Sequence, residues 1–591
     1  MVVLGVDVGG TFTDAVLLSE DGLRTAKVPT VARQAQSVLA AARAVGADQV
    51  DRFTHGTTIA TNALLERKGA RTAFVSTAGF EHLLHLRRQN RAHLYRLCQA
   101  HAEPLVPLER CHGVSERIGP DGVLVPLELD SLPVLGDDVE AVAVCLLFAF
   151  RDPSHERAVA DELRRQLPRA RVVASHEVAP EFREYERAST TAVDAYLGPS
   201  VSGYLNALGR GCSEAGLPEP LVMRSSGGVA SLAEAAAHPA LALVSGPAAG
   251  VVGAAKIAAL AGIENAISLD MGGTSTDVCL ISGGEAGRAA ERDVAGFPLR
   301  LSTVDLQTVG AGGGSILWRD SGGALRVGPE SAGAEPGPAC YGRGGERPTV
   351  TDANLLLGRL PVRIASGLEL DRVAAEQALA GIDPGEAIEV ANAEMLRALR
   401  LVSVERGLDP REFALVAFGG AGPLHGCALA EELGMETVLV PASAGVLSAL
   451  GLAVSDERRD RVESRVCLLE EAGQLPVAGE ADLRYRGQSF ELTVALEPDL
   501  AGAFHRAHEA RYGYANPESP IELVAVRTAE VRPGPPLVLP RVEPLELAGP
   551  TRVELDGATC WIPPGWVGVR DGTSSTLRLT KVSQERGNSG T

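Results

Sequence analysis

The chain has 591 residues, more than one hydrophobic core ordinarily accommodates, so we expect roughly two to four domains. A net charge of −20 makes its surface repel nucleic acid and anionic membranes, and both are excluded as partners. The nine cysteines include no Cys-x-x-Cys pair, no stretch is apolar enough to span a membrane, and the N-terminus lacks the basic segment of a signal peptide, so a cytoplasmic location is expected.

The first predicted elements form a β-hairpin with a glycine-rich turn. An apolar run at residues 2–8 leads into a glycine pair at residues 9–10, and a second apolar run at residues 15–18 ends at a turn at residues 21–22. Two helices and a strand are predicted next, at residues 34–44, 59–66 and 72–76.

The middle of the chain alternates between a buried strand and helices. Residues 140–150 are almost wholly apolar and predict a buried strand, and residues 153–166 follow with helical periodicity. A longer helix is predicted at residues 190–208, with an interruption near the Gly-Pro pair at residues 198–199. Residues 242–261 predict a loop that enters a helix of small residues.

The pattern of the N-terminus then restarts. Strands are predicted at residues 267–270 and 278–281, separated by a glycine pair. A further strand at residues 415–418 ends in a glycine-rich loop, and a helix follows at residues 424–433. After about Asp456 the sequence becomes charged, β-prone and proline-containing. The expected regions are residues 1–190, residues 191–456, residues 457–580 and a disordered tail at residues 581–591.

One eight-residue pattern, Asp-x-Gly-Gly-Thr-x-Thr-Asp, occurs twice, at residues 7–14 and 270–277. A single copy is compatible with an ordinary turn, but two copies that share six positions between apolar strands indicate a common function. Glycines allow backbone N–H groups to surround phosphate oxygens, and threonine hydroxyls add donors. The predicted phosphate ligands are Gly9, Gly10, Thr11, Thr13, Asp14, Gly272, Gly273, Thr274 and Thr276. Asp7, Asp270 and Asp277 are the predicted carboxylates for Mg²⁺ and its waters, and the first two are also predicted to act in catalysis.

A third glycine loop, at residues 418–423, lies between a predicted strand and a predicted helix. Its Gly-Gly-x-Gly arrangement lets a flat adenine and its ribose lie against the backbone. The predicted adenosine ligands are Gly419, Gly420 and Gly422. The run at residues 310–315 is expected to approach the nucleotide through Gly312 and Gly313, although it is also compatible with a flexible turn. The chain has no Walker A sequence, and neither copy of the repeated pattern has the Gly-x-Gly-x-x-Gly of a dinucleotide site.

The order of these sites along the chain, phosphate, phosphate and adenosine, resembles that of the actin-like ATPase superfamily. This resemblance implies an α/β protein with two lobes, each built on a ribonuclease-H-like mixed sheet, and ATP with Mg²⁺ between the lobes. The C-terminal region is expected to form a smaller, β-rich part.

Several further segments resemble the hydantoinase A/5-oxoprolinase family, over about residues 3–460. They are residues 54–66, 183–187, 245–250, 328–342 and 349–354. The resemblance implies that ATP activates the carbonyl oxygen of a cyclic amide, an imide or a ketone, and that a separate hydantoinase B-like subunit completes the reaction in a hetero-oligomer. Two departures bear on the substrate, because Gln307 stands where the family often has a histidine and Arg224 stands where it has a glutamine.

Within residues 54–66 we expect contacts with substrate or with the γ-phosphate. The catalytic candidates are His55, Thr57, Thr58 and Asn62. They combine imidazole, hydroxyl and amide groups at the start of a predicted helix, where the helix dipole favours negative charge. The alternative is structural: the threonines cap that helix and the histidine is a loop residue.

Residues 183–187 are interpreted either as functional or as a solvated helix face. Cys340 is predicted to serve in packing, and His425 is predicted to lie at the start of a helix.

The leading hypothesis is phosphorylation of a carbonyl oxygen in a hydantoin, 5-oxoproline or lactam, followed by ring hydrolysis with the hydantoinase B-like partner. The alternatives are the ATPase subunit of a ketone carboxylase, a small-molecule kinase that releases a stable product, and a regulatory actin-like ATPase that uses nucleotide as a switch. ATP turnover that depends on a cyclic amide separates the leading hypothesis from the switch.

Overall fold

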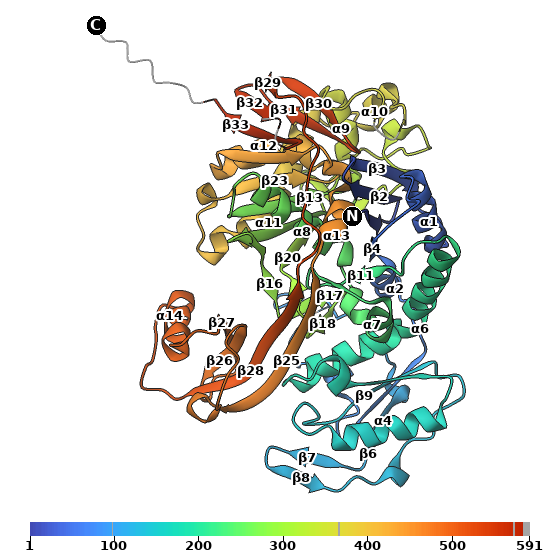
Figure 1. Ribbon diagram of the computed structural model, residues 1–591, viewed down its shortest axis with the longest axis vertical. Coiled ribbons are helices and arrows are strands. Elements are labelled where there is room, and N and C mark those ends of the chain that lie inside the picture. The colour runs from blue at the N-terminus through green and yellow to red at the C-terminus, as the bar shows by residue number, and fades with distance from the viewer. Residues whose placement is uncertain (97, 365–366, 571, 573, 583–591) are drawn as a thin grey trace.

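The computed structural model describes residues 1–96, 98–364, 367–570, 572 and 574–582. Two large β-sheets and one smaller sheet organise these residues (Figure 1). In spatial order, the first large sheet contains β27 (Leu492–Ala495), β26 (Glu480–Tyr485), β28 (Ile521–Arg532), β25 (Glu457–Leu468), β12 (Val229–Ala230), β11 (Leu221–Met223), β4 (Arg52–Thr57), β1 (Val3–Val8), β2 (Phe12–Ser19) and β3 (Gly22–Pro29). The second contains β15 (Glu285–Ala286), β14 (Thr276–Ser282), β13 (Ala266–Met271), β23 (Ala414–Phe418), β24 (Thr437–Pro441), β33 (Thr576–Lys581), β32 (Trp566–Arg570) and β29 (Leu545–Ala548), and β20 (Leu306–Val309) pairs with β14.

The two large sheets share one arrangement of strands. The order β3-β2-β1-β4-β11 in the first sheet corresponds to the order β15-β14-β13-β23-β24 in the second. In each case an antiparallel meander is followed by two strands that run parallel to its first strand. This duplicated topology confirms the predicted fold class, an α/β actin-like ATPase with two ribonuclease-H-like lobes.

The smaller sheet is parallel and lies at the lower end of the view in Figure 1. It contains β10 (Arg171–Ala174), β9 (Ala141–Cys145), β5 (Thr72–Thr77) and β6 (Cys111–Val114). Two helices pack against it, α4 (Ser154–Gln166) and α6 (Glu184–Glu214). Because its strands fall between β4 and β11 in the sequence, this sheet is an insertion into the first lobe.

The remaining helices are α1 (Gln34–Ala44), α2 (Ile59–Leu65), α3 (Leu83–Leu86), α5 (Ser175–Val178), α7 (Leu232–Ala237), α8 (Ser245–Leu260), α9 (Val350–Leu356), α10 (Arg372–Ala378), α11 (Pro384–Val402), α12 (Gly422–Leu433), α13 (Leu447–Val454) and α14 (Leu500–Tyr512). The helices predicted at residues 34–44, 59–66 and 153–166 are confirmed, each with both ends within one residue of α1, α2 and α4. Within the described residues, no helix combines the length and the apolar character needed to cross a membrane.

Two predicted elements differ from the structure. The strand predicted at residues 140–150 ends at Cys145, and Phe148 adopts a φ of 57° in the turn that follows. The helix predicted to be interrupted near residues 198–199 is instead continuous over 31 residues as α6. Pro199 itself is exposed, so its ring lies on the solvent side of the helix and not in the core.

The region at residues 457–580, expected as one β-rich part, is divided between the lobes. β25 to β28 extend the first sheet, with α14 packed against β27, whereas β29, β32 and β33 extend the second. β33 pairs antiparallel with β24 and so covers an edge of the second sheet. The boundaries expected after residues 190 and 456 remain predictions. The expected tail at residues 581–591 lies, after Val582, outside the described residues.

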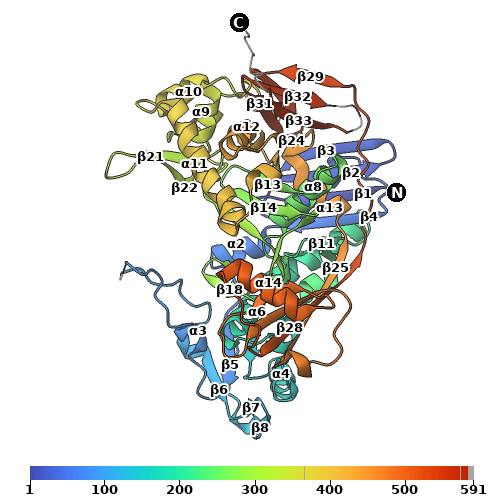
Figure 2. The same ribbon diagram turned by 90° about the vertical axis from the view of Figure 1, so that its left-hand side faces the viewer.

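Two helices, α8 and α13, lie between the large sheets (Figure 2). α13 packs on β1, β2 and β4, and α8 contacts both β4 and β13. The two helix backbones approach closely, because a Cβ atom added to Gly451 would lie 2.0 Å from the carbonyl oxygen of Ala249. Glycine at this crossing allows the close contact between the two helices that lie between the lobes.

Replacing Gly451 by alanine is expected to destabilise the protein by about 1–3 kcal/mol, because the added methyl group forces α8 and α13 apart. The measurement is the midpoint of thermal or urea unfolding. Gly203→Ala is the matched control, since Gly203 is exposed on α6 and an added Cβ would meet nothing within 4 Å. The control is expected to be neutral or to stabilise by roughly 0.5–1 kcal/mol. Equal unfolding midpoints for Gly451→Ala and Gly203→Ala would contradict the close packing of α8 against α13 at Gly451.

Candidate active site

A cavity of about 520 Å³ lies between the two glycine-rich hairpin turns, which join β1 to β2 and β13 to β14. Each turn is closed by a backbone hydrogen bond: Gly9 N–H donates to the Phe12 carbonyl at 2.9 Å, and Gly272 N–H donates to the Ser275 carbonyl at 3.0 Å. The volume is typical of a small-molecule site. The sequence-predicted residues on the cavity wall are Asp7, Gly9, Gly10, Thr11, Asp14, Asp270, Gly272, Gly273, Thr274, Asp277, Gly313, Gly419 and Gly420.

Other predicted nucleotide ligands lie behind this wall. The Thr13 hydroxyl is 3.0 Å from the hydroxyl of Thr30. The Thr276 hydroxyl donates to a backbone carbonyl of the loop at residues 310–315. Gly312 packs against the second hairpin, since an added Cβ would lie 2.7 Å from its backbone, and Gly422 begins α12. These residues hold the loops in place, and direct contact between them and a nucleotide stays a prediction.

The register of each hairpin brings two carboxylates together. Asp7 lies opposite Asp14 in the first hairpin, and Asp270 lies opposite Asp277 in the second. Burial raises the pKa of Asp7 to about 7, and the neighbouring charge of Asp14 adds to this shift. Burial also raises the pKa of Asp270 to about 8, with a further contribution from Asp277. The cavity therefore gathers carboxylates that retain protons until a cation neutralises them.

These carboxylates fit a magnesium ion that arrives with a nucleotide. The Oδ1 atom of Asp7 is buried and has no hydrogen-bond partner among the described residues, so it is available as a ligand. Mg²⁺ prefers oxygen ligands and is usually held by one or two carboxylates together with phosphate oxygens and water. In the part of the chain that the structure describes, no group of three or more His, Cys, Asp or Glu residues is arranged to hold a metal by itself.

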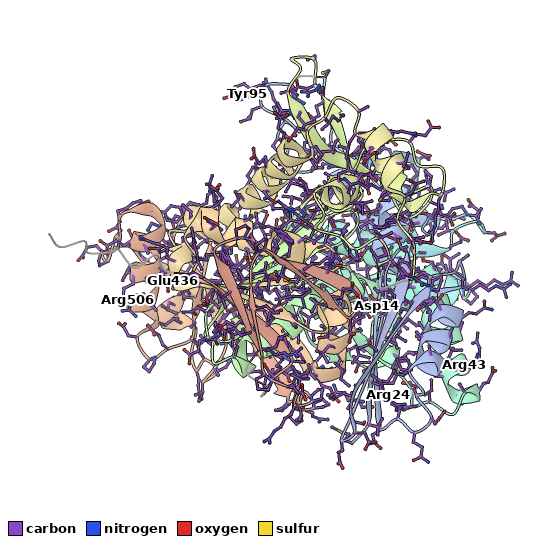
Figure 3. All side chains as sticks on the ribbon, turned by 90° about the horizontal axis from the view of Figure 1, so that it is seen from above. Asp14, Arg24, Arg43, Tyr95, Glu436 and Arg506 are labelled. Atoms are coloured by element: carbon purple, nitrogen blue, oxygen red, sulfur yellow. The ribbon has the colours of Figure 1, made fainter. Side chains whose placement is uncertain are left out.

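Lys27 lies on the cavity wall although it is not among the residues predicted from the sequence. Its Nζ lies 2.5 Å from Oδ1 of Asp14 and donates to the carbonyl of Gly445 at 3.3 Å. Among the described residues it is the sole lysine or arginine on the cavity wall. The turn predicted at residues 21–22 was a usable signal, because the hairpin register places Lys27 opposite Asp14. Figure 3 shows Asp14 toward the middle of the molecule, whereas Arg24 of the same hairpin lies near its outline.

The structure places His55 away from the cavity, where we expected contact with a ligand. Parallel pairing of β4 with β1 puts it beside Val6 in the sheet interior, where it is fully buried. Its Nδ1 is 3.1 Å from the carbonyl of Val6, and its Nε2 is 2.8 Å from the hydroxyl of Tyr204. Because a carbonyl only accepts, Nδ1 carries the proton and the Tyr204 hydroxyl donates to Nε2. Burial lowers the pKa of His55 to about 4, so the neutral ring supports the first hairpin from behind.

Thr57, Thr58 and Asn62 also lie outside the wall of this cavity. The Thr57 hydroxyl accepts a hydrogen bond from the N–H of Ile59 at 3.2 Å, as side chains at helix starts do. The Asn62 amide donates to the Thr58 hydroxyl at 3.4 Å. This geometry supports the structural alternative for the threonines, and contact of these residues with substrate stays a prediction.

Other residues singled out in the sequence have structural partners. Arg183 pairs with Glu491 at 2.5 Å, and Arg187 is fully buried with its guanidinium donating to backbone carbonyls. Arg224 pairs with a glutamate of α7 at 3.0 Å. Burial raises the pKa of the Cys340 thiol, which disfavours the nucleophilic thiolate. These contacts favour the structural interpretation of the run at residues 183–187 and of Cys340.

Two family models match the chain. One, described as hydantoinase/oxoprolinase, matches residues 187–461, and the other, described as the hydantoinase/oxoprolinase N-terminal region, matches residues 3–167. The caprolactamase subunit alpha of Pseudomonas jessenii is 34% identical over 95% of this chain and 90% of its own length.

Two solved structures are similar over nearly their whole length. The ATP-dependent caprolactamase from Pseudomonas jessenii superposes with a TM-score of 0.84 at 30% identity, covering 98% of this chain and 99% of that chain. A nucleotide-free acetone carboxylase structure gives a TM-score of 0.78 at 25% identity, covering 98% of this chain and 100% of that chain.

The raised pKa values of Asp7 and Asp270 predict that the ligand-free protein loses stability as pH rises. Between about pH 4 and pH 8 the folded chain binds protons at these carboxyls that the unfolded chain has released, so the free energy of unfolding falls with increasing pH. Asp270→Asn is expected to melt at a higher temperature than the wild type above about pH 8, and the difference is expected to vanish only below about pH 4, where the unfolded chain also keeps this proton. Asp121→Asn, at an exposed position, is the control. A difference in melting temperature between Asp270→Asn and the wild type that stays constant from about pH 4 to about pH 8 would contradict the raised pKa of Asp270.

Proposed function

The chain belongs to the hydantoinase/oxoprolinase family of ATP-dependent hydrolases, and we propose that it phosphorylates the carbonyl oxygen of a cyclic amide or imide. The observation that carries this proposal is the pair of glycine-rich hairpins that face one cavity, each with its own carboxylate pair. Such a site can bind a triphosphate through both lobes at once. The similarity to an ATP-dependent caprolactamase supports a lactam or a related ring as the second substrate.

In the proposed complex, the backbone N–H groups of both hairpin turns hold the phosphates of ATP, and the loop at Gly419 and Gly420 supports its adenosine. Asp7, Asp270 and Asp277 would hold Mg²⁺ and its waters, which supplies charge neutralisation at the phosphates. Lys27 adds a positive charge on the side of the first hairpin. The N–H groups stabilise the negative charge that develops on the phosphoryl oxygens during transfer.

The proposed chemistry converts an inert amide into a reactive electrophile. The carbonyl oxygen attacks the γ-phosphorus, the bond from that phosphorus to the bridging oxygen breaks, and ADP leaves. Water then adds to the activated carbon and the ring C–N bond breaks, which leaves the phosphoryl group on the new carboxyl as an acyl phosphate. A second water hydrolyses this acyl phosphate and releases phosphate, so a lactam, ATP and two waters give an amino acid, ADP and phosphate.

The final hydrolysis is assigned to a separate hydantoinase B-like subunit, so that the active form is a hetero-oligomer. In the described part of the chain, the cavity wall contains neither histidine nor cysteine, and His55 is buried and neutral. The name of the Pseudomonas jessenii relative, a subunit alpha, supports a multi-subunit assembly. Dependence on ATP supports the expected cytoplasmic location.

A ketone carboxylase subunit is the second candidate function. The similarity to acetone carboxylase favours it, because phosphorylation of an enol oxygen needs the same nucleotide site. The two candidates differ in the co-substrate of the second step, which is water in one and bicarbonate in the other.

The test combines the chain with a hydantoinase B-like protein from the same source and measures ADP release with lactams, hydantoin, 5-oxoproline and acetone, with and without bicarbonate. We expect ATP turnover that depends on a cyclic amide, and ring opening that also needs the partner. Turnover with acetone and bicarbonate alone would favour the carboxylase. A stable phosphorylated product from the chain alone would identify a kinase, and ATP turnover that no substrate changes would identify a regulatory switch.

Replacing Lys27 by methionine is expected to weaken ATP binding about tenfold or more, because the cavity then contains carboxylates without their cation. Binding of adenosine, which has no phosphates, is expected to stay unchanged, and both affinities are measured by calorimetry. Lys256→Met is the matched control, since Lys256 lies on α8, half-exposed and 4.0 Å from Asp456. Equal loss of ATP and adenosine binding in Lys27→Met would show that the lysine does not act on the phosphates.

A further inference from the structure

One side of the cavity is apolar and is not explained by phosphate binding. Its wall there includes Tyr341, Leu360, Leu370 and Leu424. It also includes Asn354, which lies one helical turn, about 5 Å, beyond Thr351 along α9. The Thr351 hydroxyl donates to the carbonyl of Gly313 at 2.8 Å, beside the second hairpin. α9 therefore leads from the phosphate side of the cavity to its apolar side.

Asn354 has a buried acceptor without a partner. The residue is 1% exposed, and its Nδ2 donates to the carbonyl of Val350 at 3.2 Å and to Nε2 of His425 at 3.3 Å. Its Oδ1 is buried and has no hydrogen-bond partner within the described residues. A buried carbonyl oxygen of this kind is costly to leave unpaired, so a ligand donor in the cavity would restore the lost hydrogen bond.

The neighbours of Asn354 fix which atom of its amide is paired and which is left without a partner. The carbonyl of Val350 only accepts, so the atom opposite it must be the amide nitrogen. His425 Nε2 faces the same nitrogen and must therefore accept, which leaves the ring proton on Nδ1. Nδ1 in turn donates to Oδ1 of Asn392 on α11 at 2.7 Å. Full burial lowers the pKa of His425 to about 3, so this orientation holds at neutral pH.

We propose that Oδ1 of Asn354 accepts a hydrogen bond from the exocyclic 6-amino group of adenine, and that this contact selects ATP over triphosphates with a 6-oxo purine. The inference rests on the proposed function, because it assigns the base subsite of the same cavity. Adenine presents a donor at position 6, whereas hypoxanthine and guanine present an acceptor that would face the acceptor of Asn354. Tyr341, Leu360 and Leu370 provide apolar contact for the ring. His425 and Asn392 are positioning residues that act through the amide of Asn354.

The first test needs no mutation. Calorimetry on the full chain with Mg²⁺ compares ATP, ITP and N6,N6-dimethyl-ATP, of which only ATP has a donor at position 6. We expect ATP to bind about 100-fold more tightly than the other two, because a site built for one donor rejects analogues that lack it. Equal binding of the three would overturn the proposal and leave the triphosphate site intact. Failure of the folded chain to bind any triphosphate would overturn the proposed function as well.

The second test uses variants. Asn354→Leu keeps the approximate size of the side chain and removes the acceptor, so we expect the ATP/ITP ratio to fall to about one through weaker ATP binding. Asn206→Leu, at an exposed position on α6, is the control and is expected to keep the wild-type ratio. His425→Leu is expected to lower the ratio about tenfold, whereas His425→Gln, whose amide can both donate and accept, restores most of it. A ratio unchanged in Asn354→Leu would overturn the proposal.

Discussion

The crowding of carboxylates around one cavity is the constraint on which the rest of the site depends. Hairpin register places Asp7 opposite Asp14 and Asp270 opposite Asp277, so a local adjustment cannot separate the members of a pair. Lys27 neutralises part of this negative charge. In the ligand-free chain, protons retained on Asp7 and Asp270 neutralise a further part. A triphosphate with its cation would replace those protons, which couples binding to proton release.

The two halves of the site come from distant parts of the chain, and packing between the lobes sets their separation. α8 and α13 lie between the large sheets, and their close crossing at Gly451 leaves no room for a side chain. The first hairpin is supported from behind by the neutral ring of His55, and the second by the loop at residues 310–315. Glycine therefore allows the close approach of backbones in the core, and the same freedom in the turns is what the proposed contact with phosphates would use.

Local signals predicted much of the site, whereas long-range contacts determined the remainder. The duplicated pattern identified both hairpins, because glycine turns between apolar strands are encoded within a few residues. His55 was misplaced because its burial depends on the parallel partner strand β1, which periodicity does not reveal. The acceptor of Asn354 depends on His425, 71 residues away in sequence, and no local pattern indicates that contact. The continuity of α6 through Pro199 likewise depends on which side of the helix faces water.

The division of the C-terminal region between both sheets has a consequence for synthesis on the ribosome. Neither large sheet is complete until the last strands are made, because β25 to β28 complete the first and β29, β32 and β33 complete the second. Translation from Glu457 to Lys581 takes on the order of ten seconds. During that interval β24 presents an unpaired edge, so this edge of the nascent chain is exposed to chaperones and to aggregation until β33 covers it.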